Sequence, residues 1–225
     1  MNDDIQVLRV ETDFQHQMAL EVMREVYRDE KHWVGEDEKL VAAADLDNRS
    51  ITWLVAVLHY RPVGVLRVLY DPPLDLYREY GFRMVDDTLN LEHLLRTSHI
   101  AEIGRFAVLP ECRRNLRVAM SLMRHAGQET VERGYTHYIT DVFEGERHSP
   151  YEFHRRVIGF RLVATHDHGE LNCPNRRLTM ILDIREALQR LRQSRRRVFR
   201  RLVGEWEPRA AGLLASPATV AVASA

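Results

Sequence analysis

The chain has 225 residues, of which 45% are hydrophobic and 29% are charged, and its formal net charge is −1. These values suit a compact domain with a large core and give no overall attraction to nucleic acid or to a membrane surface. Two cysteines cannot build a disulfide framework or a zinc knuckle, and no signal-like segment opens the sequence, so we expect a reducing, cytoplasmic location. No apolar run approaches the roughly 18 residues that a membrane span needs.

The first 50 residues predict a strand, a helix and an acidic loop. Residues 5–10 alternate in polarity as a strand does, and Thr12 or Asp13 then offers an N-cap for a helix that reaches about residue 29. The expected apolar face of this helix holds Phe14, Met18, Val22 and Val26. Residues 35–50 are acidic and show no period, which indicates a loop.

An antiparallel hairpin is expected next. Residues 51–59 and 63–70 are rich in β-branched and aliphatic side chains, and they flank a Tyr60-Arg61-Pro62 turn. Arg67 lies inside the second strand, where a buried guanidinium needs an anionic partner. Glu102 and the Asp45/Asp47 pair are the candidate partners.

The remaining elements alternate between strands and helices. A long connection over residues 71–99 contains a short helix near 89–96. It is followed by strand 101–108, a helix from Val118 to a glycine stop at Gly134, strand 136–142, helix 149–156, and paired strands 160–165 and 177–183. We expect residues 1–183 to form one domain, residues 184–207 to add one arginine-rich helix, and residues 208–225 to be a disordered tail.

The strand over residues 101–108 carries an acid and a base among apolar residues. Strict alternation places Glu102, Gly104 and Phe106 on one face, and Ile103, Arg105 and Ala107 on the other. A carboxylate on a buried strand is costly unless it is paired or used. Glu102 is therefore either a strand-end ion pair or a catalytic group.

An arginine-rich turn follows this strand and begins a helix. Free backbone N–H groups and the positive end of the helix favour an anion there, and the nearby side chains of Arg113, Arg114 and Arg117 add positive charge. The sequence therefore predicts a phosphate-binding turn, with a solvated basic turn as the alternative.

The order of these elements resembles the GNAT acyltransferase superfamily over residues 5–183. The segment Val108-Leu-Pro-Glu-Cys-Arg113-Arg114 is similar to the acyl-donor loop of that superfamily, and Phe153 to Phe160 is similar to its later Gly-Phe segment. This resemblance implies an α/β fold with a mixed central sheet flanked by helices. The usual loop glycines are replaced, with Arg117 at one of their positions.

A narrower resemblance accounts for these replacements. The fragments that carry it look similar to the acyl-carrier-protein-dependent branch of the fold, and they are Arg24, Val26-Tyr27, Glu30, Asp45-x-Asp47, Gly64-x-x-Arg67 and Glu102-x-x-Arg105-Phe106. That branch includes the FeeM-type N-acyl amino acid synthases and the LuxI-type acyl-homoserine-lactone synthases. The hairpin and the Gly159-Phe160 segment favour the FeeM type.

The resemblance implies transfer of a medium or long acyl chain from acyl carrier protein to the amine of an amino acid, with acyl-phosphopantetheine as co-substrate and no permanently bound cofactor. Glu102 would be the base, assisted by Arg67 and Arg105. The acceptor would contact Arg24, Trp33, Asp45, Asp47 and Phe106. The donor phosphate would lie against Val108, Arg113, Arg114 and Arg117. Tyr151 and His154 are both candidates for protonating the thiolate.

Two alternative functions stay open at this point. Lactone synthesis from S-adenosylmethionine fits the Glu102-to-Arg105 fragment as well, and a non-catalytic module that binds an acyl carrier would need the same surface. The segment His166-Asp167-His168 has no convincing third ligand, so we expect a turn there and no metal. The basic residues lack interleaved aromatic residues, so no nucleic-acid partner is expected.

Overall fold

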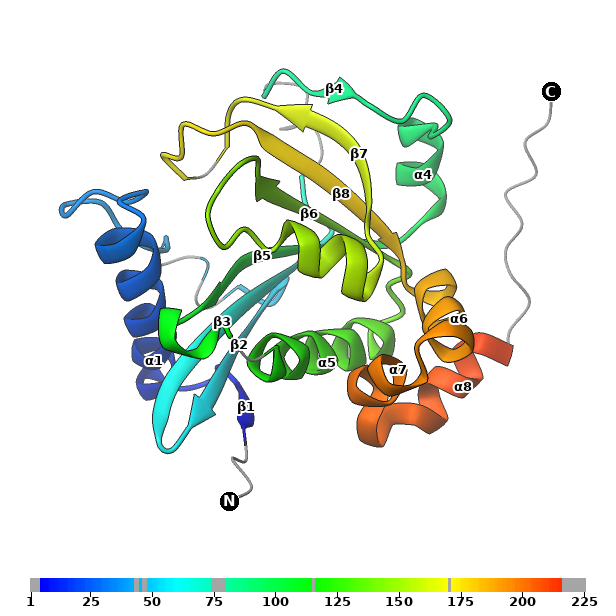
Figure 1. The fold of residues 1–225 in the computed structure, drawn as a ribbon, viewed down its shortest axis with the longest axis horizontal. Helices are drawn as coiled ribbons and strands as arrows, with labels where there is room; N and C mark the ends of the chain where they lie inside the picture. The colour runs from blue at the N-terminus through cyan, green and yellow to red at the C-terminus, as the bar shows by residue number, and fades with distance from the viewer. Residues whose placement is uncertain are drawn as a thin grey trace.

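The computed structural model describes residues 5–42, 45, 48–73, 80–114, 116–169 and 171–215. Its strands form one sheet in the order β1-β2-β3-β5-β6-β8-β7-β4 (Figure 1). Their bounds are β1 Gln6–Arg9, β2 Ile51–Leu58, β3 Arg61–Tyr70, β4 Arg83–Met84, β5 Ile100–Val108, β6 His137–Phe143, β7 Arg161–His166 and β8 Arg177–Asp183. The paired strands are antiparallel except for β5 and β6.

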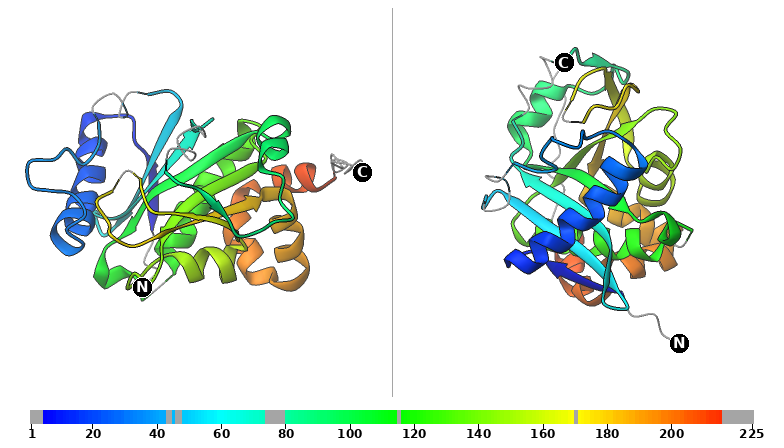
Figure 2. Two further views of the ribbon diagram at one scale, coloured as in Figure 1. Left: turned by 90° about the horizontal axis from the view of Figure 1, so that it is seen from above. Right: turned by 90° about the vertical axis from the view of Figure 1, so that its left-hand side faces the viewer.

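The described helices cover the sheet, and the last of them follow the final strand as a C-terminal extension of the chain. They are α1 Asp13–Met23, α4 Leu91–Thr97, α5 Arg117–Glu132, α6 Ile184–Ser194, α7 Arg196–Val203 and α8 Glu207–Ala215, with the π-helical η1 Arg24–Glu30 and η3 Phe153–Ile158 and the 3₁₀ turns η2 Pro110–Cys112 and η4 Gly204–Trp206. Helices α1 and α5 pack against opposite faces of β2 and β3 (Figure 2). The mixed α/β architecture predicted from the sequence is confirmed.

The first helix begins as predicted and, as α1 followed by η1, ends at Glu30, close to the predicted end near residue 29. Thr12 caps it in a capping box with Gln15, and the chain then runs without a break into η1. Met18, Val22 and Val26 are buried, whereas Phe14 is 74% exposed, so its placement on the apolar face is wrong. Phe14 lies in the first turn, where the helix has not yet reached the sheet.

The β2–β3 hairpin turns one residue earlier than predicted. Arg61 is already paired with Leu58, and the turn consists of His59 and Tyr60, whose φ angles are 49° and 65°. Two successive positive φ values are typical of the tight turns that match the twist of a hairpin.

Strands β5 and β6 part at the centre of the sheet. Their parallel ladder runs from Ile100 beside His137 to Ile103 beside Thr140. Beyond this point β5 continues against β3 as far as Val108, while β6 continues against β8 as far as Phe143. The separation opens a gap in the layer that side chains and a ligand can occupy.

A β-bulge interrupts β5 beside this gap. Gly104 lies opposite Arg67 and Ala107 lies opposite Val65, so Arg105 and Phe106 together face the single residue between them on β3. Because paired residues share a face of the sheet, Gly104 and Ala107 lie on the same face. The strict alternation predicted for this strand is therefore wrong beyond Gly104.

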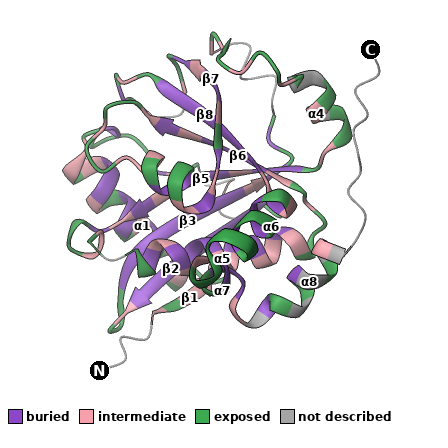
Figure 3. Cartoon of the chain, turned by 45° about the vertical axis from the view of Figure 1, so that its right-hand side comes forward, coloured by how far each residue is buried: buried purple, intermediate pink, exposed green. Residues whose placement is uncertain are grey.

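The C-terminal helices differ from the single appended helix and disordered tail expected from the sequence. The chain breaks at Arg195 into α6 and α7, and α8 extends through Ala215. Leu191, Phe199 and Trp206 are buried in the same hydrophobic cluster as the sheet. Figure 3 shows buried segments beside exposed ones in α6 and α8. These helices are thus part of the main core, and residues 216–225 lie outside the described residues.

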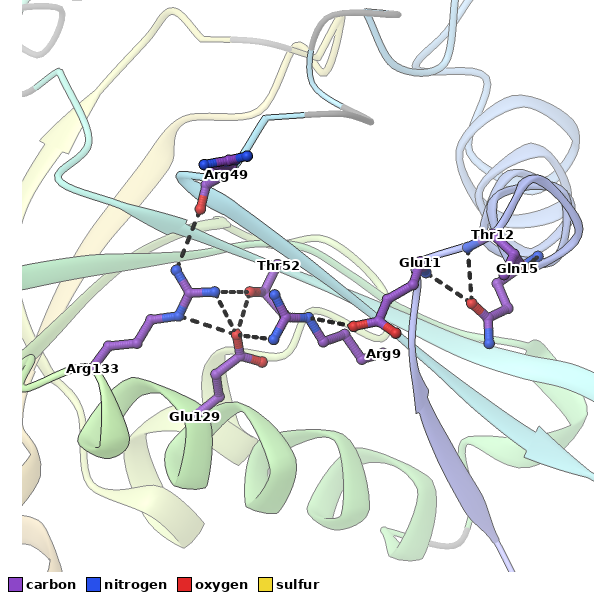
Figure 4. A network of polar contacts seen from close by, with 8 residues as sticks. All are labelled: Arg9, Glu11, Thr12, Gln15, Arg49, Thr52, Glu129 and Arg133. Carbon is purple, nitrogen blue, oxygen red and sulfur yellow. Dashed lines mark hydrogen bonds and ion pairs between the residues drawn. The ribbon is translucent and has the colours of Figure 1, made fainter.

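A polar network ties the first two strands to the end of α5 (Figure 4). Glu129 accepts hydrogen bonds from Thr52 at 2.7 Å and from Arg133 at 2.8 Å, and it forms an ion pair with Arg9 at 3.2 Å. The Arg133 guanidinium also lies over the ring of Tyr70, with 4.3 Å to the ring centre. This network fixes α5 at the end away from its arginine-rich start.

Within the residues described, no helix is long and apolar enough to cross a bilayer, and no group of three His, Cys, Asp or Glu side chains is arranged to hold a metal ion.

Candidate active site

A cavity of about 450 Å³ lies where β5 and β6 part. Its walls come from β3, β5, β6, the end of η1, the start of α5 and the beginning of η3. The predicted site residues that line it are Trp33, Arg67, Glu102, Arg105, Phe106, Val108 and Arg113. Residues far apart in the chain therefore meet around the strand that the sequence had marked as the candidate site.

Glu102 forms an ion pair with Arg67 on the cavity wall. Nη2 of Arg67 donates to Oε1 of Glu102 at 2.7 Å, and the two side chains are 4% and 19% exposed. The buried guanidinium of Arg67 thus has the anionic partner that was predicted from the sequence. Among the predicted candidates, this partner is Glu102. The partly exposed carboxylate keeps access to the cavity.

Gly104 makes room for this ion pair. A Cβ atom at this position would lie 2.8 Å from Oε1 of Glu102 and 3.0 Å from Nη2 of Arg67, closer than side-chain carbons approach such atoms. No role was predicted for Gly104 from the sequence. The signal that could have revealed its role is its position two residues after Glu102, on the same face of the strand.

Arg105 and Phe106 form the bulge and both face the cavity. Arg105 has a φ angle of 47°, and its guanidinium lies 5.8 Å from the ring centre of Tyr27. Phe106 packs against Phe153 and His154, with ring centres 5.9 Å and 5.6 Å away. The bulge thereby brings a cation and an aromatic ring to the same stretch of wall.

An aromatic wall stands at the end of η1. The Trp33 ring lies 4.4 Å from the ring of Phe143 and 6.0 Å from that of Tyr27, measured between centres, and all three line the cavity. Beside them, Lys31 forms ion pairs with Glu30 and Glu146. This part of the cavity is therefore apolar at its surface, with charges at its edge.

Arg113 is held by the protein itself. Its Nε donates to the carbonyl oxygen of Val108 at 2.7 Å, and Nη1 and Nη2 donate to the two carboxylate oxygens of Glu30 at 2.6 and 2.5 Å. This paired contact with Arg113 lowers the pKa of Glu30. Three of the N–H groups of Arg113 are thus engaged, and its charge is balanced before any phosphate arrives.

The other predicted site residues that the structure describes do not line the cavity. Arg114 and Arg117 are exposed at the start of α5, and Arg24 is exposed on η1. The backbone carbonyl of Asp45 accepts a hydrogen bond from Trp53 at 3.3 Å, while Asp47 lies outside the described residues. Asp45 is thus placed away from the lining of the cavity, and binding of the acceptor amine by the Asp45/Asp47 pair stays a prediction.

Between the two candidates for the thiolate-protonating group, His154 lines the cavity and Tyr151 does not. The π-helical turn of η3 absorbs one extra residue, which explains why the sequence spacing was ambiguous. His154 is completely buried, and burial lowers its pKa to about 3. The imidazole is consequently neutral at physiological pH and is not a cationic acid.

The segment His166-Asp167-His168 contacts Asp141 through its first histidine. His166 is buried, and its ring contacts the Asp141 carboxylate at 3.0 Å and the carbonyl oxygen of His168 at 2.7 Å. Asp141 and Tyr80, whose ring stacks on His166, both line the cavity. The sequence analysis missed Asp141, because only the strand pairing brings it beside Glu102.

The family profile of the N-acyl amino acid synthase FeeM matches residues 18–181 of this chain, which is more than half of its length. The chain belongs to the FeeM N-acyl amino acid synthase family. It is an N-acyltransferase, as the sequence resemblance predicted. A comparison with curated proteins finds no match.

Solved structures show the same fold at low sequence identity. FeeM from uncultured soil microbes aligns with a TM-score of 0.62 and 14% identity, covering 83% of this chain and 94% of the other. The CoA-dependent acyl-homoserine lactone synthase BjaI aligns at 0.54 and 17%, covering 86% and 88%. A protein from Desulfovibrio desulfuricans described as an acetyltransferase of the GNAT family aligns at 0.55 and 13%, covering 80% and 99%. The fold is that of the GNAT superfamily.

Proposed function

We propose that this FeeM-family protein transfers a medium or long fatty acyl chain from the thioester of acyl carrier protein to the amine of an amino acid. The observation that carries the proposal is the Glu102 carboxylate, which faces the cavity and is held by Arg67 at 2.7 Å. A positioned carboxylate can act as the general base for amide formation, because the amine must lose a proton.

In the proposed reaction, the amine nitrogen attacks the thioester carbonyl carbon and gives up a proton to Glu102. A carbon–nitrogen bond forms, the carbon–sulfur bond breaks, and the phosphopantetheine thiolate leaves. Base assistance of this kind is typically worth about 10² to 10⁴ in rate. The bulge at Arg105 and Phe106 interrupts the β3 ladder on the strand that carries Glu102, and the oxyanion is proposed to form beside it.

Arg105 is proposed to bind the carboxylate of the acceptor. Its guanidinium lies on the cavity wall beside Tyr27, on the strand that carries Glu102. A planar guanidinium matches a carboxylate with two parallel hydrogen bonds, which fixes the amino acid relative to the base. Trp33 and Phe106 supply apolar surface for the rest of the acceptor or for the acyl chain.

The donor phosphate is proposed to bind Arg114 and Arg117 at the start of α5, beside the Val108 end of β5. Both side chains are exposed there, unlike Arg113, which Glu30 neutralises. Together with the exposed Arg24 they would attract an acidic carrier protein through its charge. Cys112 and Cys173 are free thiols, which fits the cytoplasmic location that belongs to this proposal.

The test is to incubate the purified protein with long-chain acyl carrier protein, the matched acyl-CoA, pooled amino acids and S-adenosylmethionine, and to identify the products by mass spectrometry. We expect N-acyl amino acids formed from the carrier thioester. Turnover from acyl-CoA alone would overturn the choice of donor. Lactone with methylthioadenosine would identify a homoserine-lactone synthase, and the absence of any product would favour a carrier-binding module.

A further inference from the structure

A second carboxylate faces the cavity on the strand next to Glu102. Asp141 of β6 lines the cavity with 29% of its side chain exposed. Glu102 lies beside Ile139, and Asp141 follows two residues later, so both carboxylates lie on the same face of the sheet. Both carboxylates line the same cavity, at the point where β5 and β6 part, so a small polar group bound there is flanked by both.

The space between the two carboxylates is open. The ladder between β5 and β6 ends at Ile103 and Thr140, so the next residues, Gly104 and Asp141, are the first on each strand beyond the point of separation. Gly104 has no side chain to fill the gap, and a Cβ there would approach Glu102 to 2.8 Å. The cavity begins at this position.

Asp141 is oriented from behind by two residues of neighbouring strands. Thr179 of β8 donates to its Oδ1 at 2.7 Å, and Nε2 of His166 on β7 lies 3.0 Å from its Oδ2. The other ring nitrogen of His166 lies 2.7 Å from the carbonyl oxygen of His168. Both ring nitrogens of His166 thus contact oxygen atoms, which fixes the ring and, through it, the orientation of the Asp141 carboxylate.

Two groups on the cavity wall still have capacity to bind a ligand. A carboxylate accepts about four hydrogen bonds, and the contacts of Asp141 described above use two of them. Independently, His154 on the same wall is completely buried, and within the described residues neither of its ring nitrogens has a hydrogen-bond partner. Buried polar atoms without a partner are rare and are expected to be satisfied by a ligand or by water.

We propose that Asp141 binds the ammonium group of the acyl acceptor, holding it between the Asp141 and Glu102 carboxylates. This inference rests on the proposed function and specifies its acceptor as an amine that is positively charged when free. Asp141 takes the role that the sequence had given to Asp45 and Asp47. Glu102 then removes one proton from the ammonium, and the resulting amine attacks the thioester carbonyl carbon. The second proton that the nitrogen loses passes to the departing thiolate, which leaves as the thiol, while Asp141 keeps the nitrogen in place.

Binding is tested first, without any acyl donor. Saturation-transfer NMR of the wild-type protein with pooled free amino acids should detect at least one ligand, and the N-acetylated forms of the same amino acids, which lack an ammonium group, should not bind. The Asp141→Asn variant should lose this binding. The matched control is Asp167→Asn, which removes an exposed carboxylate that does not line the cavity.

Kinetics give an independent readout. A hydrogen bond between charged groups is worth about 1.5 to 3 kcal/mol, so Asp141→Asn should raise the KM for the acceptor roughly 10-fold to 100-fold. The KM for the acyl thioester should stay within about twofold, because the donor does not contact Asp141 in this proposal. An unchanged acceptor KM, or an equal rise for donor and acceptor, would overturn the inference.

A measurement on the wild-type protein covers the case in which Asp141→Asn does not fold. Adding the amino acid that binds should shift the ring ¹⁵N–¹H signals of His166, because its Nε2 contacts the carboxylate that receives the ammonium. A bound amino acid that leaves these signals unchanged, or the absence of any bound amino acid, would overturn the subsite. Binding that requires Asp141 without turnover would instead overturn the proposed reaction and keep the subsite.

Discussion

Gly104 lies so close to Glu102 that a Cβ atom on the glycine would come within 2.8 Å of the carboxylate oxygen Oε1. The atoms that it would meet are the flexible ends of Glu102 and Arg67, so Gly104→Ala should fold with nearly wild-type stability. The ion pair must shift, however, and a displacement of about 1 Å in a catalytic group can cost about 10²-fold in rate. We expect kcat to fall by that order while the melting temperature changes little.

The control for this change is Gly127→Ala on α5. The nearest atom to a Cβ there is Cζ2 of Trp206 at 3.5 Å, an ordinary contact, and Gly127 does not line the cavity. Turnover by the control should match that of the wild type. Full activity of Gly104→Ala would show that the position of the Glu102–Arg67 pair is not critical.

Glu102→Gln tests the base directly. The amide keeps the size of the side chain and still accepts from Arg67, but it cannot take a proton at neutral pH. We expect kcat to fall about 10²-fold to 10⁴-fold, as for loss of a general base, with the KM for the acyl thioester nearly unchanged. The comparison is Glu21→Gln, an exposed position on α1, measured in the same steady-state assay. A loss of less than threefold would remove Glu102 from the base role.

Local patterns in the sequence were sufficient to predict most of the elements. Alternation identified β1, β-branched and aliphatic residues identified the β2–β3 hairpin, and Thr12 was one of two predicted N-caps for α1. The Glu102–Arg67 pair was also predictable, because a charged pair on apolar strands has few other partners. The C-terminal extension was predicted wrongly, since the Ala-rich and Ser-rich composition after Pro208 does not reveal that α8 extends through Ala215 and that Ala210 is buried.

Contacts between strands that are far apart in the sequence could not be predicted from the sequence. The bulge at Arg105 depends on the register with β3, and the position of Asp141 beside Glu102 depends on where the β5–β6 ladder stops. Neither feature corresponds to a pattern within a single segment of the sequence. The same holds for Arg113, whose partner Glu30 lies 83 residues earlier in the chain.

Substitutions of Arg113 and of Arg114 should distinguish a structural role from binding of the acyl donor. Arg113→Met leaves Glu30 without its paired hydrogen bonds, so the free energy of unfolding should fall by about 1 to 3 kcal/mol. Arg114→Met changes an exposed side chain and should alter stability by less than about 0.5 kcal/mol. It should instead raise the KM for the acyl thioester. Urea titrations and steady-state kinetics on both variants are the measurements. A loss of stability in Arg114→Met together with a raised KM for the acyl thioester in Arg113→Met alone would contradict the prediction.

The C-terminal helices should be required for folding. Trp206 is 5% exposed and lies against Gly127 of α5, so Trp206→Ala should reduce the free energy of unfolding by about 3 kcal/mol or more. Arg197→Ala, on the exposed side of α7, should change it by less than about 0.5 kcal/mol. Equal stability of the two variants in denaturant titrations would show that these helices are an appendage.

His154 should make the protein less stable in mild acid. Its pKa is lowered from 6.5 to about 3 by burial, so the unfolded chain binds a proton below pH 6.5 that the folded chain does not. Unfolding is therefore favoured increasingly as the pH falls from 6.5 toward 3. At pH 5 this linkage amounts to about 2 kcal/mol relative to pH 7. His154→Leu has no such proton, so its urea-unfolding free energy should fall less between the two pH values, by about that amount. Parallel pH dependence of the variant and the wild type would mean that the folded protein accommodates a charged His154.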